Sequence, residues 1–199
     1  MPRDSFAEIA DDALLVLYAN GDADAARLLT HRLLPRLVGF AGRMLADRGE
    51  AEDVAQEVML RLWQMAPGWR QDQAKVSTWA YRVASNLCTD RLRQRQRRRL
   101  SALDDVAEPV DAAASVVAGM IAADRMAALD AALARLPERQ REAVVLRHLE
   151  GMTNPEIAEI LQIGVEAVES LTARGKRALT AALSGQRAAL GYDEEDANG

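Results

Sequence analysis

Several features that would narrow the class of this protein are scarce or missing. Its 199 residues include a single cysteine, Cys88, so no internal disulfide can form, which fits a reducing compartment. No apolar run approaches the roughly 20 residues that span a membrane, and the first residues lack a signal-peptide core. We therefore expect a cytoplasmic protein without membrane insertion. Aromatic and β-branched residues are also few, which argues against a sheet-rich fold.

The abundant residues favour helices. Alanine, leucine, arginine and glutamate dominate, and 49% of the residues are apolar, enough for one or two domains with modest cores. The formal net charge of -5 does not by itself indicate a nucleic-acid binder. The charge is unevenly distributed, however, because residues 70–99 hold nine basic and two acidic side chains. A local basic patch of this kind can bind phosphate groups even when the net charge of the whole chain is negative.

The segment 76–99 combines a helical apolar pattern with a cluster of arginines. Trp79, Val83 and Leu87 recur every four residues, which predicts a helix with one buried side. Six arginines follow within residues 91–99, a charge density suited to binding a polyanion. A solvated helix end followed by a basic linker explains the same arginines, and this segment alone does not decide between the two interpretations.

A second amphipathic helix is predicted at 51–65. Val54, Val58 and Leu62 share its apolar side. A neighbouring face of the same helix carries four residues that are not part of the apolar side: Asp53, Gln56, Glu57 and Leu60. Such a face is usually only solvated, so its function must be argued from the rest of the chain.

Composition changes abruptly after Arg99. Residues 101–117 are rich in alanine and aspartate and have no clear period, which predicts a flexible acidic linker. Helices are then predicted at about 119–136 and 137–149. The end of the chain is polar and acidic, and we expect it to be mobile.

The segment 155–183 has the pattern of a helix-turn-helix. A short helix capped by Thr153 or Asn154, a three-residue turn and a longer helix are predicted at 155–161, 162–164 and 165–183. Three small or branched apolar residues lie five apart, where they let two helices cross closely: Ala158, Ile163 and Val168. A plain helical hairpin does not need that spacing, although it remains the alternative.

Two basic elements in separate helical domains, the second a helix-turn-helix, make the chain resemble the extracytoplasmic-function sigma factors, the smallest group of the bacterial sigma-70 family. The resemblance covers residues 11–183 in the expected order and spacing. Four runs carry it: AEDVAQEVMLRLW (51–63), VSTWAYRVASNLCTDRLR (76–93), LPERQREAVVLRHLEGMTNPEIAEIL (136–161) and VEAVESLTARGKRAL (165–179).

The resemblance implies an all-α fold of two small helical domains, a sigma-2-like bundle and a sigma-4-like helix-turn-helix domain, joined by the flexible acidic linker. The expected bounds of the first domain, the linker, the second domain and a mobile acidic tail are 8–99, 100–118, 119–184 and 185–199. The first domain is expected to bind core polymerase and to recognise and melt the −10 element. The second is expected to recognise the −35 element.

The resemblance also implies three sets of site residues. The residues expected to contact the clamp helices of the RNA polymerase β′ subunit are Asp53, Gln56, Glu57 and Leu60, whose acceptors suit arginines on a partner helix. Those expected at the −10 element are Lys75, Ser77, Arg82, Asn86, Arg91 and Arg93, with the loop at 72–77 as the wall of a pocket for an extruded base. Those expected at the −35 element, within the helix-turn-helix at 155–179, are Glu169, Ser170, Ala173, Arg174, Lys176 and Arg177.

The sequence departs from the family's pattern in the helix-turn-helix. Family members commonly carry LGIS in the turn, whereas the run here is LQIG, residues 161–164. Gln162 must then adopt a conformation that suits glycine, and Gly164 caps less well than serine. Many members have lysine in place of Glu169 and arginine in place of Leu171, so the groove-facing surface is less basic than usual.

The partners that the resemblance implies are core RNA polymerase, through its β′ clamp helices and β flap, promoter DNA and a cognate anti-sigma factor that reports on stress. We expect no cofactor. His31, His148 and Cys88 are isolated in the sequence and form no motif of metal ligands or catalytic residues, so we expect neither a metal site nor an enzyme. The alternatives are a dimeric ligand-sensing regulator, which would bind palindromic duplex DNA, and a structural helical adaptor.

Overall fold

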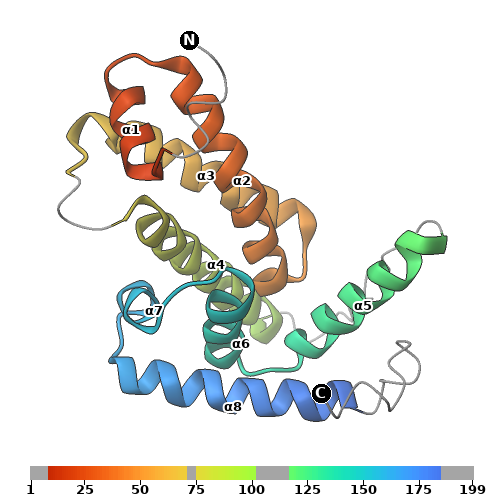
Figure 1. Ribbon diagram of the computed structural model, residues 1–199. Coiled ribbons are helices and arrows are strands. Elements are labelled where there is room, and N and C mark those ends of the chain that lie inside the picture. Colours follow the sequence, from red (N-terminus) through yellow and green to blue (C-terminus); the bar gives the residue numbers. More distant parts are fainter. Residues whose placement is uncertain (1–8, 71–74, 102–116, 185–199) are drawn as a thin grey trace, which may run out of the picture.

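The computed structural model describes residues 9–70, 75–101 and 117–184 (Figure 1). Within these ranges every regular element is a helix, which confirms the predicted all-α class. The first domain contains α1 (Asp11–Ala19), α2 (Ala23–Leu45), α3 (Arg48–Met65), a short 3-10 helix (Ala66–Gly68) and α4 (Val76–Ser101). The second contains α5 (Val117–Ala134), α6 (Glu138–Val144), a π-helical turn (Val145–Leu149), α7 (Asn154–Leu161) and α8 (Val165–Ser184). Most of the expected linker and the whole expected tail lie outside the described residues.

The first domain is built around α2. Leu29, Leu33 and Leu37 recur every four residues along this helix and are fully buried. Helices α1, α3 and α4 pack against it. The carboxylate of Asp22 starts α2 by accepting hydrogen bonds from the N–H groups of residues 24 and 25, at 2.9 and 3.1 Å.

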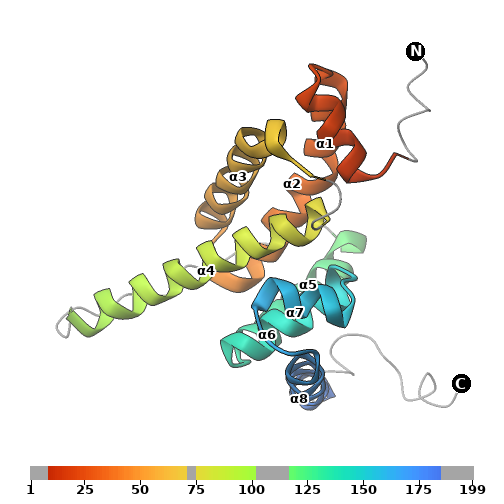
Figure 2. The same cartoon turned by 90° about the vertical axis from the view of Figure 1, so that its left-hand side faces the viewer.

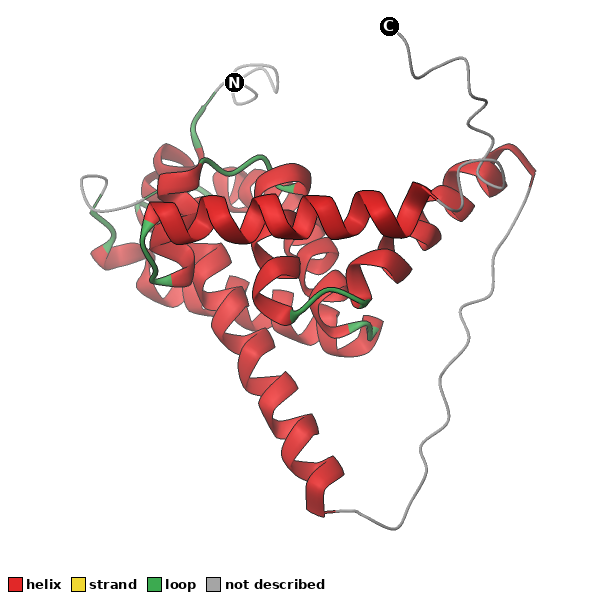
Figure 3. Ribbon diagram, turned by 90° about the horizontal axis from the view of Figure 1, so that it is seen from below, coloured by secondary structure: helices red, strands yellow, loops and turns green. Residues whose placement is uncertain are grey.

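Helix α4 contacts both domains. Its first half lies between α2 and α3 on one side and α7 on the other, and its last turns project beyond both domains (Figures 2 and 3). The small residues Ala80, Ala84 and Cys88 are fully buried, whereas the larger stripe at Trp79, Val83 and Leu87 is half-buried. The small residues therefore lie where α4 comes closest to the neighbouring helices, because a helix packed on two sides has little room for large side chains.

The helix predicted at 137–149 is interrupted. Helix α6 ends at Val144, and a π-helical turn follows in which the N–H of Glu150 donates to the carbonyl of Val145 at 3.0 Å. Such turns widen a helix locally and change the direction of the residues that follow. The carboxylate of Glu150 lies against α4, where it accepts a hydrogen bond from Tyr81.

Helices α7 and α8 and the turn between them follow the predicted succession. Thr153 caps α7 in a capping box: its hydroxyl oxygen accepts from the N–H of Glu156, and the Glu156 carboxylate accepts from the N–H of Thr153 at 2.8 Å. Val168 is fully buried, as its spacing predicts. Gln162 ends α7 with φ 54° and ψ 47°, the left-handed conformation that was expected to be unfavourable for it.

Replacing Gln162 with glycine is expected to stabilise the second domain by about 0.5–1 kcal/mol. The left-handed conformation strains a residue with a Cβ, and relief of this strain outweighs the greater freedom of glycine in the unfolded chain. Urea denaturation followed by circular dichroism measures the difference. Gln64→Gly, at an exposed site within α3, is the matched control and is expected to lower stability by about 1 kcal/mol. Equal losses in both variants would contradict the prediction.

Candidate functional site

One side of α3 carries the four residues expected to meet polymerase, here called the α3 face: Asp53, Gln56, Glu57 and Leu60. The Asp53 side chain is 69% exposed and Leu60 is 56% exposed. Gln56 is exposed as well, and Glu57 accepts a hydrogen bond from Arg61 at 2.8 Å. The α3 face thus combines an exposed leucine with several hydrogen-bond acceptors, a composition suited to a protein partner.

The residues expected at the −10 element form the α4 face: Lys75, Ser77, Arg82, Asn86, Arg91 and Arg93. Asn86 and Arg93 are exposed, and Arg82 is half-buried. The start of α4 is held by Asp12, whose carboxylate accepts from the N–H of Val76 at 2.8 Å. Of the expected pocket wall at 72–77, residues 72–74 lie outside the described residues. The spacing of Lys75, Arg82, Asn86 and Arg93 puts these four residues on one side of the helix. Ser77 and Arg91 lie on the opposite side, where Arg91 contacts Glu50, so the expected residues are only partly brought together.

Two arginines of the basic run are engaged inside the first domain. Arg91 donates to the carbonyl of Glu50 at 2.9 Å. Arg95 donates to the carbonyl of Leu45, at the C-terminus of α2, at 2.7 Å, and pairs with Asp47 and Glu50 at 3.2 and 3.1 Å. Sequence reasoning treated Arg95 as a phosphate contact and missed this role. The acidic start of α3 was the available signal, but it is far from Arg95 in the sequence.

The residues expected at the −35 element form the α8 face: Glu169, Ser170, Ala173, Arg174, Lys176 and Arg177. All of them are exposed. Glu169 accepts from the side-chain amide of Asn154 at 3.5 Å, and Arg174 donates to the carbonyl of Ser170 at 3.3 Å. These contacts stay within the helix-turn-helix and leave the outer side of α8 open to a ligand.

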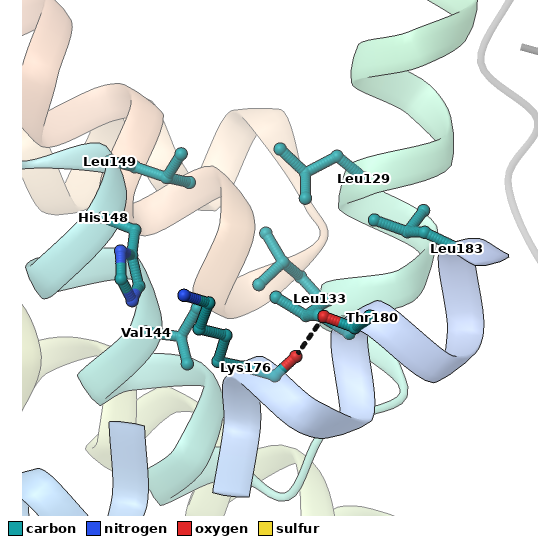
Figure 4. Close-up of a pocket in the computed structure, with 9 residues that line it drawn as sticks. Leu129, Leu133, Val144, His148, Leu149, Lys176, Thr180 and Leu183 are labelled. Carbon is teal, nitrogen blue, oxygen red and sulfur yellow. Dashed lines mark hydrogen bonds between the residues drawn. The ribbon is translucent and has the colours of Figure 1, made fainter. Parts of the chain in front are cut away.

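Lys176 also borders a cavity of about 180 Å³ between α5, α6 and α8 (Figure 4). Its lining is apolar except at the rim: Leu129, Leu133, Val144, Leu149, Leu179 and Leu183, with His148, Lys176 and Thr180. Burial, with a smaller effect from the Lys176 charge, lowers the pKa of His148. Lys176 therefore lies nearer to the core of its domain than Arg174 or Arg177 does.

A glycine in α8 was overlooked by the sequence interpretation. Gly175 is buried where α8 crosses α6, and a Cβ at this position would lie 2.5 Å from Val144 Cγ2 and 3.2 Å from the carbonyl oxygen of Gln140. The close helix crossing therefore requires glycine. A glycine inside a predicted helix is the signal that could have revealed it.

The single thiol is buried. Burial, together with the charge of Glu142, raises the pKa of Cys88 to about 12, so the thiol is unreactive. In the described part of the chain no group of three or more potential ligands is arranged to hold a metal ion. None of the described helices is both long and apolar enough to cross a bilayer.

The fold and these faces define a two-domain helical protein with a helix-turn-helix and exposed polar faces on three different helices. A family model described as sigma-70 region 2 matches residues 29–98, and a model described as sigma-70 region 4 matches residues 126–179. The chain is 34% identical over 175 residues to the ECF RNA polymerase sigma factor SigM of Mycobacterium tuberculosis, covering 86% of this chain and 84% of the relative. It is 31% identical to the ECF RNA polymerase sigma factor SigW of Bacillus subtilis, covering 80% and 89%. The chain belongs to the extracytoplasmic-function (ECF) sigma factors of the sigma-70 family.

Two solved structures share the fold. One is the sigma factor RpoE from Bartonella quintana in complex with the anti-sigma factor NepR, with a TM-score of 0.65 and 20% identity over 79% of this chain and 96% of that one. The other is CnrH in complex with the cytosolic domain of CnrY, with a TM-score of 0.63 and 24% identity over 89% and 99% of the two chains. At these identities the likeness supports the arrangement of helices.

Proposed function

We propose that the chain binds core RNA polymerase and directs it to promoters, with the first domain at the −10 element and the second at the −35 element. The observation that carries this proposal is the presence of three exposed polar faces, on α3, α4 and α8, within the two regions that match the sigma-70 models. The proposed bounds remain 8–99 and 119–184 for the domains and 100–118 for the linker. The role is that of a cytoplasmic transcription factor rather than an enzyme.

In this proposal the α3 face binds the β′ clamp helices. Its acceptors pair with arginines of the partner, and Leu60 fills the centre of the contact. The cavity side of the second domain is the proposed contact for the β flap, because the lining of the cavity is mostly apolar.

The α4 face is proposed to bind the melted −10 element. Taking bases out of the stack costs a few kcal/mol per step, so the protein must bind the extruded strand to keep it open. Asn86 is placed for this because its amide is exposed and can pair with a base edge, and Arg93 is free of the core and can contact phosphate. Arg91 is a weaker candidate, since it already holds the carbonyl of Glu50.

The α8 face is proposed to enter the major groove of the −35 element. Arg174 and Arg177 are the main candidates for base and phosphate contacts, with Lys176 as a further phosphate contact. Glu169 can accept from a cytosine amino group, which would alter the sequence that is read.

We also propose that a cognate anti-sigma factor holds the chain inactive until a stress signal arrives. The support is that the fold is shared with RpoE, which was solved in complex with the anti-sigma factor NepR.

Transcription in vitro with core RNA polymerase tests the proposed function. On a library of genomic fragments, we expect the chain to produce transcripts with defined start sites that core enzyme alone does not produce. Arg174→Ala is expected to reduce these transcripts by about tenfold, equivalent to the loss of one good base contact. Ser184→Ala, at the exposed end of the same helix, is the control and should leave them unchanged. A chain that binds duplex DNA as a dimer but never engages core would instead be a ligand-sensing regulator.

A further inference from the structure

Residues 96–101, the last turns of α4, form an exposed basic segment, here called the α4 end, that projects beyond both domains (Figures 2 and 3). Arg97, Arg98 and Arg99 follow one another in it, and each is exposed. Within the described part of the chain none of the three is in an ion pair, whereas Arg91 and Arg95 are held by the first domain. The α4 end therefore holds positive charge that is available to an outside partner.

A serine closes this segment. Ser101 is the last residue of α4 and is exposed. Its Oγ lies 3.1 Å from the carbonyl oxygen of Arg97 and 3.0 Å from that of Arg98, so the hydroxyl donates within its own helix. Leu100, directly before it, is 67% exposed. A terminal turn held only by its own helix unfolds at little cost, so the hydroxyl can be presented to an enzyme in an extended segment.

The residues before Ser101 form a charge pattern that a serine kinase can recognise. Arginines stand two, three and four residues before the hydroxyl. Among the serines and threonines of the described ranges, only Ser101 follows three arginines in this way. Kinases select substrates by such charge patterns, and guanidinium groups at these positions suit the carboxylates of an acidic substrate groove. The recognition groups and the nucleophile thus occur together on one accessible segment.

A phosphate on Ser101 would lie beside its own arginines. Residues three and four apart are neighbours on a helix, so the phosphate reaches Arg98 and Arg97. A phosphoserine carries about −1.5 to −2 charges at pH 7 and accepts charge-assisted hydrogen bonds from arginine. The helix dipole disfavours a phosphate at this end, and the pairing with the two arginines offsets that cost. Most of the unpaired positive charge of the α4 end would therefore be neutralised.

We propose that Ser101 is a phosphorylation site for an ATP-dependent serine kinase with an acidic substrate groove, and that the phosphate weakens binding of nucleic acid by the α4 end. The effect on nucleic acid rests on the proposed DNA-binding role of α4. In the reaction the Oγ of Ser101 attacks the γ-phosphorus of ATP, and the bond from that phosphorus to the β,γ-bridging oxygen breaks. ADP leaves with the electron pair of the broken bond, and a carboxylate of the kinase takes the hydroxyl proton.

Phosphate incorporation into the full-length chain tests the site. The chain is incubated with ATP and the purified catalytic subunit of cyclic-AMP-dependent protein kinase, an arginine-directed enzyme that serves as the probe. We expect modification at Ser101, located by mass spectrometry of peptide fragments, and a rate about tenfold lower or less in Arg98→Gln with Arg99→Gln. Ser101→Ala should not be modified. Ser184→Ala, which removes the last serine of α8, should be modified as fast as the unchanged chain because no arginine stands in the four residues before Ser184.

Affinity for DNA tests the consequence. The phosphorylated chain and a chain treated with kinase but no ATP are titrated with a fluorescein-labelled single strand of random sequence. We expect phosphorylation to lower affinity about tenfold at low salt. The plot of log affinity against log salt concentration should become shallower by about 1.4, or roughly 0.7 for each of two lost phosphate contacts. Ser101→Asp should lower affinity about threefold, whereas Ser184→Asp, with the same added charge at the end of α8, should lower it by at most about 1.5-fold.

The outcomes separate the site from its effect. Modification of Ser101→Ala at the rate of the unchanged chain would overturn the site. Equal affinity of the phosphorylated and untreated chains, or equal losses in the two aspartate variants, would overturn the effect on nucleic acid. A chain that binds no strand before modification would overturn the proposed DNA-binding role of α4, and the incorporation assay would still decide the site. Because no polymerase is present, a failure of promoter-specific transcription would count against the proposed function alone.

Discussion

Core RNA polymerase is expected to bind the variant Asp53→Ala, Gln56→Ala, Leu60→Asp about 30-fold or more weakly than the unchanged chain. The three side chains lie on the α3 face, and none is needed for the core of the first domain. Burial of the Leu60 side chain in an interface removes apolar surface from water, which favours binding, whereas an aspartate there must be desolvated without a partner. Titration of labelled chain with core enzyme, followed by fluorescence anisotropy, measures the loss.

The control for this variant is Arg48→Ala, on the same helix and 90% exposed in its side chain. It should leave affinity for core unchanged, because Arg48 is paired with Glu52 on the helix surface, outside the α3 face. Circular dichroism should show the same helix content in both variants. Full affinity in the triple variant would remove the α3 face from the polymerase interface.

Gly175→Val is expected to destabilise the second domain by about 3 kcal/mol or more and to abolish binding at the −35 element. A Cβ at this position meets Val144 at 2.5 Å. Val144 is itself buried and has a short, branched side chain, so it cannot move aside without disturbing α6. Alanine has a higher helix propensity than glycine, but this offsets only about 1 kcal/mol of the stability lost to the clash. Gly175→Ala should therefore also destabilise the second domain, by less than Gly175→Val.

The matched control is Gly164→Ser, in the turn before α8. A Cβ there meets no atom within 4 Å, and serine is at least as good an N-cap as glycine. The thermal unfolding temperatures of the two variants are compared. Gly164→Ser shows the effect of replacing a glycine without a clash, and Gly175→Val shows the effect of disturbing the close crossing of α6 and α8. If Gly175→Val unfolds at the same temperature as Gly164→Ser, α6 and α8 do not cross as described.

The helices were largely predictable because each buries one side against its own domain. The repeat of Leu29, Leu33 and Leu37 is enough to orient α2, and Thr153 followed by Glu156 is a local signal that needs no tertiary information. The left-handed conformation of Gln162 was likewise readable from its place in the turn. Local patterns of this kind act over a few residues, where the sequence is most informative.

The contacts between the domains were not predictable in the same way. Glu142 carries the same formal charge as Glu138, which is only half-buried, yet Glu142 is fully buried and accepts a hydrogen bond from Ser85, 57 residues earlier in the chain. Arg95 was interpreted with its neighbours as part of one basic run, whereas it donates a hydrogen bond to the carbonyl of Leu45 at the end of α2. Periodicity tells which residues face inward but does not identify the partner on the other side, so these assignments required the three-dimensional structure.

Helix α4 continues to Ser101, six residues beyond Arg95, the last residue of the helix that pairs with the rest of the first domain. At about 1.5 Å per residue, the part beyond this contact is an arm of about 9 Å. The chain toward the second domain is therefore anchored at the tip of the arm rather than at the surface of the first domain. The reach of the second domain along a promoter is set by the direction and stiffness of this arm as well as by the length of chain that follows it.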